Sequence, residues 1–328
     1  MTHYFLRGGG LGESNRPPLG HGRGNLCGAP RESARPGGLH QHDGAIGGEF
    51  SFDERIWGGA VGRAKRLYVL DFNVPGEAEK VEVPTLFIDH HTQPRIRNPL
   101  VEQVNPSLGG EYYPPSCSLV VSEHFGIWNA WSALGVVGDI GGERAFELEK
   151  VRTLLEREGI SRDEALRLVE LVDSNYIAME REAVEEAVRV LLNNDIKGLL
   201  EYEPWVKKAE AIREAIEEAT SNPEERNGFA IVRFESPFNV ISKVARKLVW
   251  EMKYRGGAVV VNGNFHGNAQ VYFRVSGEEA ERTDMAELIE RVRALGTNTG
   301  GKREVMGGCV CEKGKTNDVL SIIEEYLR

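Results

Sequence analysis

The feature that most constrains this sequence is a short apolar run that ends in three polar side chains. Residues 86–88 are Leu, Phe and Ile, and Asp89, His90 and His91 follow them directly. A buried parallel strand presents side chains in this way, because open α/β sheets keep their sites at the carboxyl ends of the strands. One carboxylate and two imidazoles can bind a divalent cation and leave an imidazole for a substrate. The triplet alone would equally fit a polar loop, so the prediction depends on other segments that point to it.

Two further apolar runs also end in an acid. Residues 66–70 read as a second strand that leads to Asp71, and residues 133–138 read as the end of a helix or strand that leads to Asp139. Each run by itself would also suit a core element with a polar cap. The three runs together predict carboxylates and imidazoles that converge on a metal site, as phosphoryl chemistry requires.

In their order and spacing, Asp71, the triplet at residues 89–91 and Asp139 resemble the second, third and fourth motifs of the DHH phosphoesterases. This family includes RecJ-like exonucleases, nanoRNases, cyclic-dinucleotide phosphodiesterases and one class of inorganic pyrophosphatase. The resemblance is strong over residues 66–140. It implies an α/β fold in which a parallel-sheet DHH domain with a helical extension is joined to a smaller α/β domain of the DHHA1 type.

The resemblance also implies a role for each site residue. The intact family site holds two Mn²⁺ or Mg²⁺ ions, which Asp71 would bridge. His90 and Asp139 would hold the second ion with it. Asp89 would ligate a metal or orient the imidazoles, and His91 would contact the phosphate, so that both take part in catalysis. Oxygen and imidazole ligands without a thiolate suit Mn²⁺ or Mg²⁺ better than zinc.

Residues 1–48 differ from the rest of the chain. They hold 13 of the 38 glycines and four of the eight histidines. A segment with few β-branched residues and many glycines buries little surface, so we expect disorder here. An altered reading frame is a second explanation of this composition. Only residues 2–6 resemble a strand. The segment at residues 40–43 carries ligand-type side chains, and we interpret it as a solvated loop rather than a replacement metal motif.

The first metal motif of the family, a His and two Asp, should follow that first strand. This chain instead has Arg7 and a run of glycines there. The missing motif would remove ligands of the first metal only. We therefore expect one ion rather than two, and the activity of this chain is left open.

Residues 49–222 are expected to form the DHH domain. Its elements would be strands at 66–71 and 83–88, a loop at 98–115, helices at 118–125 and 129–137, and an almost wholly helical stretch at 142–220. The polar, turn-rich segment 221–228 is the expected boundary. Residues 228–328 would then form the DHHA1-like domain, with strands and helices in alternation.

Glycines cluster near the end of this second domain. The cluster comprises Gly300, Gly301, Lys302, Arg303, Gly307 and Gly308. Glycine lets backbone amides approach a phosphate closely, and the two basic side chains add positive charge. The cluster resembles the glycine-rich DHHA1 signature, with Lys302 where the family usually has His, so we expect it to bind substrate. Arg255 and His266 are further substrate-binding candidates, although each would also suit a solvated loop.

Composition restricts the class of function. The net charge of −10 argues against a basic field that grips long duplex DNA and favours short anionic substrates. The sequence shows no long apolar run, no apolar signal core and no pairing of cysteines for zinc, so we expect a cytoplasmic protein away from membranes.

The expected function is Mn²⁺- or Mg²⁺-dependent hydrolysis of short single-stranded oligonucleotides, dinucleotides or related nucleotide phosphoesters. One alternative is a catalytically impaired DHH protein that binds nucleotides or a partner, which the missing first motif favours. Another is an inorganic pyrophosphatase, which the glycine-rich cluster argues against. A homodimer is left open.

Overall fold

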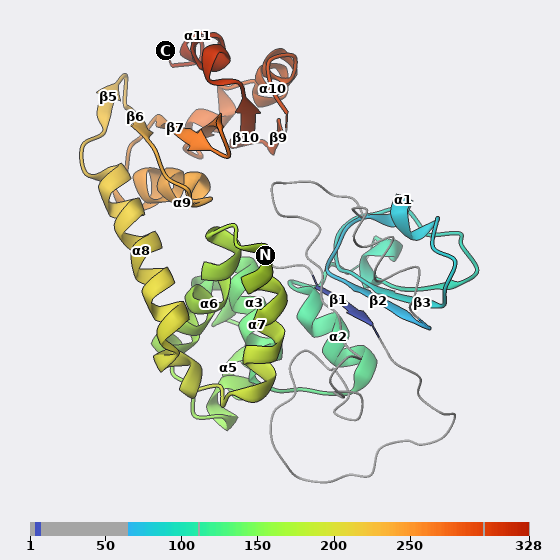
Figure 1. The fold of residues 1–328 in the computed structure, drawn as a ribbon. Helices are drawn as coiled ribbons and strands as arrows, with labels where there is room; N and C mark the ends of the chain where they lie inside the picture. Colours follow the sequence, from blue (N-terminus) through green and yellow to red (C-terminus); the bar gives the residue numbers. More distant parts are fainter. Residues whose placement is uncertain (1–3, 8–64, 111, 298, 328) are drawn as a thin grey trace. The chain divides into compact units, whose positions relative to one another are not determined.

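The computed structural model describes residues 4–7, 65–110, 112–297 and 299–327. The chain divides into two compact units (Figure 1): unit 1 comprises Met1–Tyr176 and Glu180–Val206, and unit 2 comprises Ile177–Met179 and Lys207–Arg328. The division falls inside helix α8 (Glu203–Thr220), before the connector that the sequence suggests as a boundary. It falls there because Ile212 and Ala219 of α8 belong to the core of unit 2.

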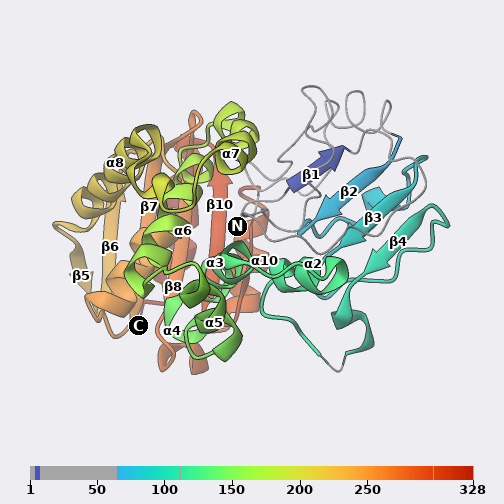
Figure 2. The ribbon, with the colours of Figure 1, turned by 90° about the horizontal axis from the view of Figure 1, so that it is seen from below.

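Unit 1 contains a four-stranded sheet with the order β1-β2-β3-β4 (Figure 2). The strands are β1 (Tyr4–Arg7), β2 (Leu67–Leu70), β3 (Thr85–Ile88) and β4 (Val101–Val104). β2, β3 and β4 are parallel, which confirms the predicted parallel sheet, whereas β1 pairs with β2 antiparallel. The prediction of an uninterrupted loop at 98–115 was wrong, because β4 and the 3₁₀ turn η4 (Pro106–Gly109) lie within it. The polar residues Glu102 and Gln103 of this edge strand hide its pattern in the sequence.

The two central strands are mostly apolar because both of their faces are covered; Thr85 at the start of β3 is a buried polar exception. Leu67, Val69 and Phe87 face a cluster that includes Phe72 and Ala78 of helix α1 (Pro75–Ala78). The alternate residues, such as Leu86 and Ile88, face Val120 and Val121 of helix α2 (Cys117–Phe125). Side chains alternate across a strand, so a strand covered on both faces is apolar at nearly every position. The apolar runs before Asp71 and Asp89 have this origin.

Beyond α2, the described part of unit 1 is largely helical, as the sequence predicts. Helix α3 (Ala130–Ile140) starts with a capping box between Asn129 and Ser132. It is followed by α4 (Gly142–Ala145), α5 (Glu149–Arg157), α6 (Arg162–Ile177), α7 (Arg181–Asn193) and the 3₁₀ turn η5 (Gly198–Glu201). A second capping box precedes α6: Glu164 N donates to Ser161 Oγ at 3.2 Å, and Ser161 N donates to Glu164 Oε2 at 2.7 Å. No helix in the described parts of the chain is long and apolar enough to cross a membrane.

Unit 2 is built on a six-stranded sheet with the order β5-β6-β7-β8-β10-β9. The strands are β5 (Glu224–Arg226), β6 (Phe229–Phe234), β7 (Gly257–Phe265), β8 (Asn268–Val275), β9 (Gly300–Lys302) and β10 (Val305–Cys311). Only β6 and β7 pair in parallel. The predicted second α/β domain is therefore confirmed, except that β5 lies inside the segment predicted as a connector.

Helices cover both faces of this sheet. Helix α9 (Ile241–Arg246) and the π-helical turn η6 (Lys247–Glu251) pack on one face. Helices α10 (Met285–Arg293) and α11 (Thr316–Glu324) pack on the other. The 3₁₀ turns η7 (Glu279–Glu281) and η8 (Lys313–Lys315) each precede one of these two helices.

Replacing Phe87 with Ala should destabilise the protein by about 3–5 kcal/mol, because this fully buried ring fills the core on one face of β3. Urea unfolding followed by circular dichroism measures the change. Leu100→Ala is the matched control: this side chain is 43% exposed beside β4, so its loss should change stability by only about 0.5 kcal/mol or less. Equal effects of the two substitutions would contradict the assigned core.

Candidate metal centre

The carboxyl ends of β2 and β3 deliver the first site residues. Asp71 follows β2, and its N–H donates to the Ile88 carbonyl at 3.0 Å, so strand pairing continues to that residue. Asp71 has a φ of 56°, in the left-handed region that Asp and Asn tolerate better than most residues. Asp89 follows β3, and its N–H donates to the Val104 carbonyl at 3.1 Å. Parallel pairing therefore brings both acids to one edge of the sheet.

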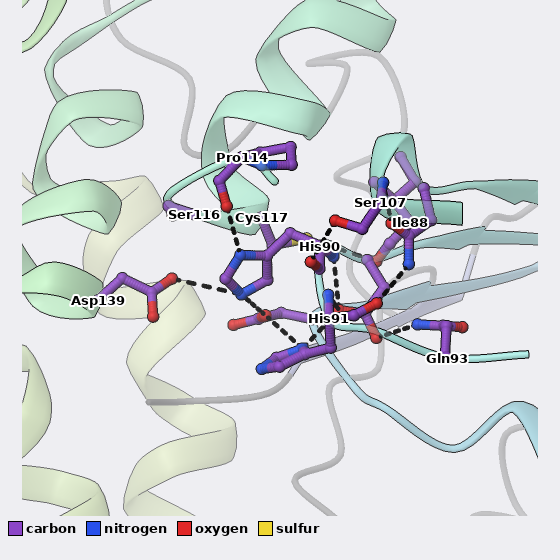
Figure 3. Close-up of polar contacts among 12 residues, drawn as sticks. Ile88, His90, His91, Gln93, Ser107, Pro114, Ser116, Cys117 and Asp139 are labelled. Atoms are coloured by element: carbon purple, nitrogen blue, oxygen red, sulfur yellow. Dashed lines mark hydrogen bonds and ion pairs between the residues drawn. The ribbon is translucent and has the colours of Figure 1, made fainter. Parts of the chain in front are cut away.

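Asp139 reaches the same place from the last turn of α3 (Figure 3). Its Oδ2 lies 3.6 Å from His90 Nε2, and Asp71 Oδ1 lies 3.5 Å from the same nitrogen. One ligand atom from each of Asp71, Asp89, His90 and His91 lies within 4.8 Å of the others. The structure thus brings together all five residues that the sequence predicts as metal-binding or catalytic. Four of them, Asp71, Asp89, His90 and His91, form a group that can hold a metal ion.

One hydrogen bond of the His90 ring selects the tautomer of its neutral form. Its Nδ1 lies 3.0 Å from the Pro114 carbonyl oxygen, which can only accept, so the proton of the neutral ring is on Nδ1. In that tautomer, Nε2 carries a lone pair aimed between two carboxylates. This buried nitrogen has no hydrogen-bond partner among the described residues. A lone pair among carboxylate oxygens is the arrangement of a metal ligand whose other ring nitrogen is held by a carbonyl.

Asp89 is fully buried and its oxygens are occupied by donors. Its Oδ1 accepts from the backbone N–H groups of His90 and His91 at 2.7 and 3.1 Å and lies 2.7 Å from His91 Nδ1. Its Oδ2 accepts from Gln93 Nε2 at 2.8 Å. Asp89 is therefore placed to orient the two histidines, and these bonds disfavour a direct metal bond to it.

The acids of the site repel one another. Burial, followed by the nearby charges of Asp139 and Asp89, raises the pKa of Asp71 well above its usual value. Burial also raises the pKa of Asp139, against the opposing effects of His90, His91 and a hydrogen bond with Ser116. Two buried carboxylates with raised pKa values are stabilised in their ionised form by a divalent cation, which fits the ligand set.

The pair formed by Asp89 and His91 has the opposite character. The hydrogen bond to Asp89 raises the pKa of His91, outweighing the effect of burial. Burial would raise the pKa of Asp89, but the hydrogen bonds and charge of His91 and the backbone bond to His90 N lower it. His91 is one-third exposed and can therefore meet a ligand while its Nδ1 stays bound to Asp89.

The sequence did not point to Asn105 and Ser107, whose side chains hydrogen-bond to the backbone of the triplet. Ser107 Oγ donates to the His90 carbonyl at 2.8 Å, and Asn105 Nδ2 donates to the His91 carbonyl at 2.8 Å. Both residues follow β4, as Asp71 follows β2. Recognition of the polar edge strand would have revealed them.

A network of serines fixes the helix that carries Asp139. Ser116 Oγ and Ser118 Oγ lie 2.8 Å apart, and Ser118 Oγ donates to the Ser132 carbonyl at 2.8 Å. Ser122 Oγ and Ser132 Oγ lie 2.6 Å apart. These buried bonds join the start of α2 to α3. Gly135 permits the close approach, because a Cβ there would lie 2.4 Å from Ser118 Oγ.

The predicted glycine-rich cluster lies mostly in strands. Gly300 and Gly301 belong to the edge strand β9, which pairs with β10 on one side. The expectation that the cluster binds substrate stays a prediction. Gly307 and Gly308 lie at a bulge in β10, where the register with β8 shifts between Met306 and Cys309. Arg303 is exposed, and its Nη2 lies 3.5 Å from Glu281 Oε1. The side chain of Lys302 is outside the described part of the chain.

Arg255 and His266, the further substrate-binding candidates, lie near the two ends of β7. Arg255 precedes β7 and His266 follows it. A strand of this length spans roughly 25–30 Å, so the two residues lie at opposite ends of the sheet. Residues 8–64, with the segment 40–43, lie outside the described residues.

Replacing Asp71 with Asn should raise the stability of the metal-free protein at neutral pH, because it removes a buried charge with a raised pKa. A raised folded-state pKa means that stability falls as pH rises from the ordinary aspartate value of about 3.9 toward the folded-state value. The gain should therefore be largest above the raised pKa and vanish in acid. Asn keeps the left-handed backbone. Thermal melts in EDTA across pH measure the effect.

Asp89→Asn is the matched comparison of opposite sign. The pKa of Asp89 is lowered, so its charge stabilises the fold above the ordinary aspartate pKa and loses this effect as pH falls. This variant should be less stable than the parent at neutral pH. Equal melting temperatures of the two variants at neutral pH would contradict the electrostatic assignment.

Replacing Gly135 with Ala should destabilise the protein by about 1–3 kcal/mol, because the new Cβ would overlap Ser118 Oγ and Cβ. Gly138→Ala is the control in the same helix. Its Cβ would meet only Val169 Cγ1 at 3.5 Å, so better helix propensity should leave stability unchanged or raise it by up to about 1 kcal/mol. Chemical unfolding compares them, and destabilisation of the same size at both positions would refute the specific contact.

No protein-family model and no curated protein matches this chain. Solved structures do. The DHH domain of a protein described as a member of a family of ribosomal proteins matches with a TM-score of 0.57 and 15% identity, covering 80% of this chain and 69% of the other. Two further matches are looser and carry no argument. One is an exopolyphosphatase-related protein from Bacteroides fragilis, with a TM-score of 0.47 and 14% identity, covering 84% of this chain and 74% of the other. The other is a pGpG-specific phosphodiesterase from Vibrio cholerae, with a TM-score of 0.40 and 14% identity, covering 75% of this chain and 80% of the other. The chain therefore has the fold of the DHH-domain proteins.

Proposed function

We propose that this protein is a metal-dependent phosphoesterase that hydrolyses short single-stranded nucleic acids, dinucleotides or related nucleotide phosphoesters. The single observation that carries the proposal is the geometry of His90. Its proton is held on Nδ1 by a carbonyl, and its Nε2 lies 3.5 and 3.6 Å from carboxylate oxygens of Asp71 and Asp139. A divalent cation at this buried point would satisfy both carboxylates and the ring nitrogen together.

Asp71, His90 and Asp139 would hold the ion. Two carboxylates and one imidazole, with no thiolate, suit Mn²⁺ or Mg²⁺. A divalent ion bound there would supply charge stabilisation to a phosphoryl oxygen and acidify a coordinated water. The residues present fit such an ion because binding it would relieve the repulsion between Asp71 and Asp139.

His91 would contact the phosphate. Its Nδ1 is held by Asp89 at 2.7 Å, which orients the ring and favours the imidazolium form. The remaining Nε2–H can then donate to a phosphate oxygen, which becomes more negative as the phosphoester bond is attacked. Asp89 acts in this step through His91, as a buried acceptor that keeps the proton on Nδ1.

The net charge of −10 supports short substrates. A chain with this balance lacks the extended positive field that grips long duplexes, whereas a local cation can still attract one phosphoester. A dinucleotide or short single strand needs only a few contacts.

A second candidate is a nucleotide-binding protein with little catalysis. The observation that favours it is the sequence after β1, which is glycine-rich and has no Asp before Asp43. The family's first metal motif would supply His and Asp at that point. A site left with one ion should then hydrolyse slowly while it still binds metal and nucleotide.

We expect Mn²⁺-dependent release of mononucleotide from a dinucleotide, and Asp139→Asn or His90→Gln should lower the rate by on the order of 10²–10³-fold. Each variant removes one ligand from the ion that stabilises the developing charge. Chromatographic separation of the products measures the rate, and calorimetric titration with Mn²⁺ measures ion binding without turnover. His124→Gln, an exposed histidine of α2, is the control and should leave both unchanged.

The outcomes separate the two candidates. One outcome is Mn²⁺ binding that depends on His90 and Asp139 without turnover of any short oligonucleotide, cyclic dinucleotide or pyrophosphate. It would contradict the enzyme proposal and support the nucleotide-binding protein. Absence of Mn²⁺ and Mg²⁺ binding by folded protein would refute both metal-based functions.

A further inference from the structure

Two glutamines continue the hydrogen bonds of the metal centre away from Asp89. Gln93 Nε2 donates to Asp89 Oδ2 at 2.8 Å (Figure 3), and Gln103 Nε2 donates to Gln93 Oε1 at 3.0 Å. Gln103 Oε1 accepts from the backbone N–H of Ile96 at 2.8 Å, and its Nε2 also donates to the Pro94 carbonyl at 3.2 Å. Two side-chain amides thus form a relay from Asp89 to the backbone of the loop that follows the triplet.

The direction of this relay follows from its two ends. The N–H group of Ile96 can only donate, so the oxygen of the Gln103 amide must face it. The nitrogen of that amide then faces the Gln93 oxygen, and Gln93 is left with its nitrogen towards Asp89. A flip of either amide would set two donors or two acceptors against each other. All donors of the relay therefore point towards Asp89, and amides linked in series strengthen one another.

Strand β4 fixes the relay in space. Gln103 of this strand lies opposite Phe87 of β3, on the face of the sheet where Ile96 packs against the same core cluster. Asn105 and Ser107, which follow β4, hold the backbone carbonyls of the two histidines of the triplet. One edge strand therefore holds the triplet through its backbone and, by way of the relay, through its acidic side chain.

The bond from Gln93 limits what Asp89 can do. One oxygen of Asp89 lies within 4.8 Å of ligand atoms of Asp71 and His90, close enough for this carboxylate to turn towards an ion. While Oδ2 accepts from Gln93, Oδ1 stays 2.7 Å from His91 Nδ1. Without the amide, a buried carboxylate oxygen would lose its donor, and a divalent cation would be the strongest replacement within reach. Gln93 therefore favours Asp89 as the partner of His91 over Asp89 as a metal ligand.

We propose that Gln93 and Gln103 are positioning residues of this site, which hold the Asp89 carboxylate on His91 and away from the metal ion. With its Nδ1 held, the His91 ring keeps one orientation, and its Nε2 stays free for a phosphate oxygen. Both glutamines act through Asp89, so they position a reacting group without being one. Their part in hydrolysis rests on the proposed function, whereas their hold on Asp89 and His91 does not.

Replacing Gln93 with Met keeps the length of the side chain and removes its amide. Loss of such an outer partner costs about 10–100-fold at metal sites, so kcat for Mn²⁺-dependent hydrolysis of a dinucleotide should fall by about that factor. KM should not change, because His91 acts on charge that develops only during the reaction. Calorimetric titration with Mn²⁺ should show an unchanged or higher affinity, since the three assigned ligands remain and Asp89 is free to join them.

Two substitutions of Gln103 separate the relay from simple support of the loop. Gln103→Met removes every bond of this amide. Gln103→Glu keeps the acceptor for Ile96 N but presents a carboxylate to Gln93, which would draw the Gln93 nitrogen away from Asp89. Gln103→Glu should therefore lower kcat more than Gln103→Met does. Support of the loop alone predicts the reverse order, because Gln103→Met loses more hydrogen bonds.

A double substitution tests the route of the effect. If the relay acts through His91, Gln93→Met should lower kcat no further once His91→Ala is present. Thr92→Val is the matched control, because Thr92 is exposed and lies between His91 and Gln93 in the same loop. This variant should leave kcat, KM and Mn²⁺ affinity unchanged.

A measurement in EDTA tests the hold on His91 without turnover. The His91 Nδ1–H that is bonded to Asp89 should give a proton NMR signal downfield of the backbone amides, because its acceptor is a buried carboxylate. The signal is assigned by its absence in His91→Gln. Gln93→Met and Gln103→Glu should shift or broaden it, whereas Thr92→Val should leave it in place.

Four results would overturn the proposal. The first is an unchanged kcat and an unchanged NMR signal in Gln93→Met. The second is weaker Mn²⁺ binding by that variant, or an undiminished effect of it beside His91→Ala, which would make Gln93 a support of the ion. The third is a smaller loss in Gln103→Glu than in Gln103→Met, and the fourth is an equal loss in Thr92→Val. A signal that responds as expected in a protein without turnover would keep the relay and refute the phosphoesterase.

Discussion

Parallel pairing of β2, β3 and β4 is the interaction on which the candidate site depends. It aligns the carboxyl ends of the strands, so residues far apart in the chain leave the sheet at the same edge. Asp71, the triplet and Asn105 all follow directly from this alignment, and the backbone bonds from Asp71 N to Ile88 and from Asp89 N to Val104 extend it to the site residues themselves. Covering both faces of the sheet with apolar groups makes this edge rigid.

The buried acids of the site lower the stability of the fold around them. Asp71 and Asp139 are held close while burial raises the pKa of both. A rigid support is needed to keep them there, and the structure supplies it by the Pro114 carbonyl on His90, the saturated Asp89 and the serine bonds between α2 and α3. Strain of this kind is common where a site awaits a cation, because the cation turns mutual repulsion into shared attraction.

Side-chain amides extend this support beyond the site in a fixed direction. Gln103 of β4 and Gln93 pass a chain of donors from the Ile96 N–H group to Asp89, so the acid accepts at both of its oxygens. The sequence hinted at neither glutamine, since a glutamine in a strand and another in a loop carry no motif. Their significance appears only when the donors and acceptors of the relay are followed together.

Much of unit 1 could be predicted from local pattern. Apolar runs that end in acids predicted β2, β3 and α3. For the two strands the reason is that a strand covered on both faces is largely apolar, and the chain leaves the sheet where the strand ends. The edge strand β4 was not predicted, because the polar residues Glu102 and Gln103 interrupt its apolar pattern. Glycine permits both strand and turn conformations, so the sequence around Gly300 and Gly301 does not reveal a strand; pairing with β10 makes one.

The sequence by itself determined which residues could bind a cation and in what order they follow the strands. Only the tertiary structure decided that His90 Nε2 faces Asp71 and Asp139, that donors occupy the oxygens of Asp89, and that two glutamines join this acid to β4. The reason is physical: residue type and spacing fix what a side chain can do, whereas distance, burial and competing hydrogen bonds fix what it does. Those quantities arise between segments that the linear chain keeps far apart.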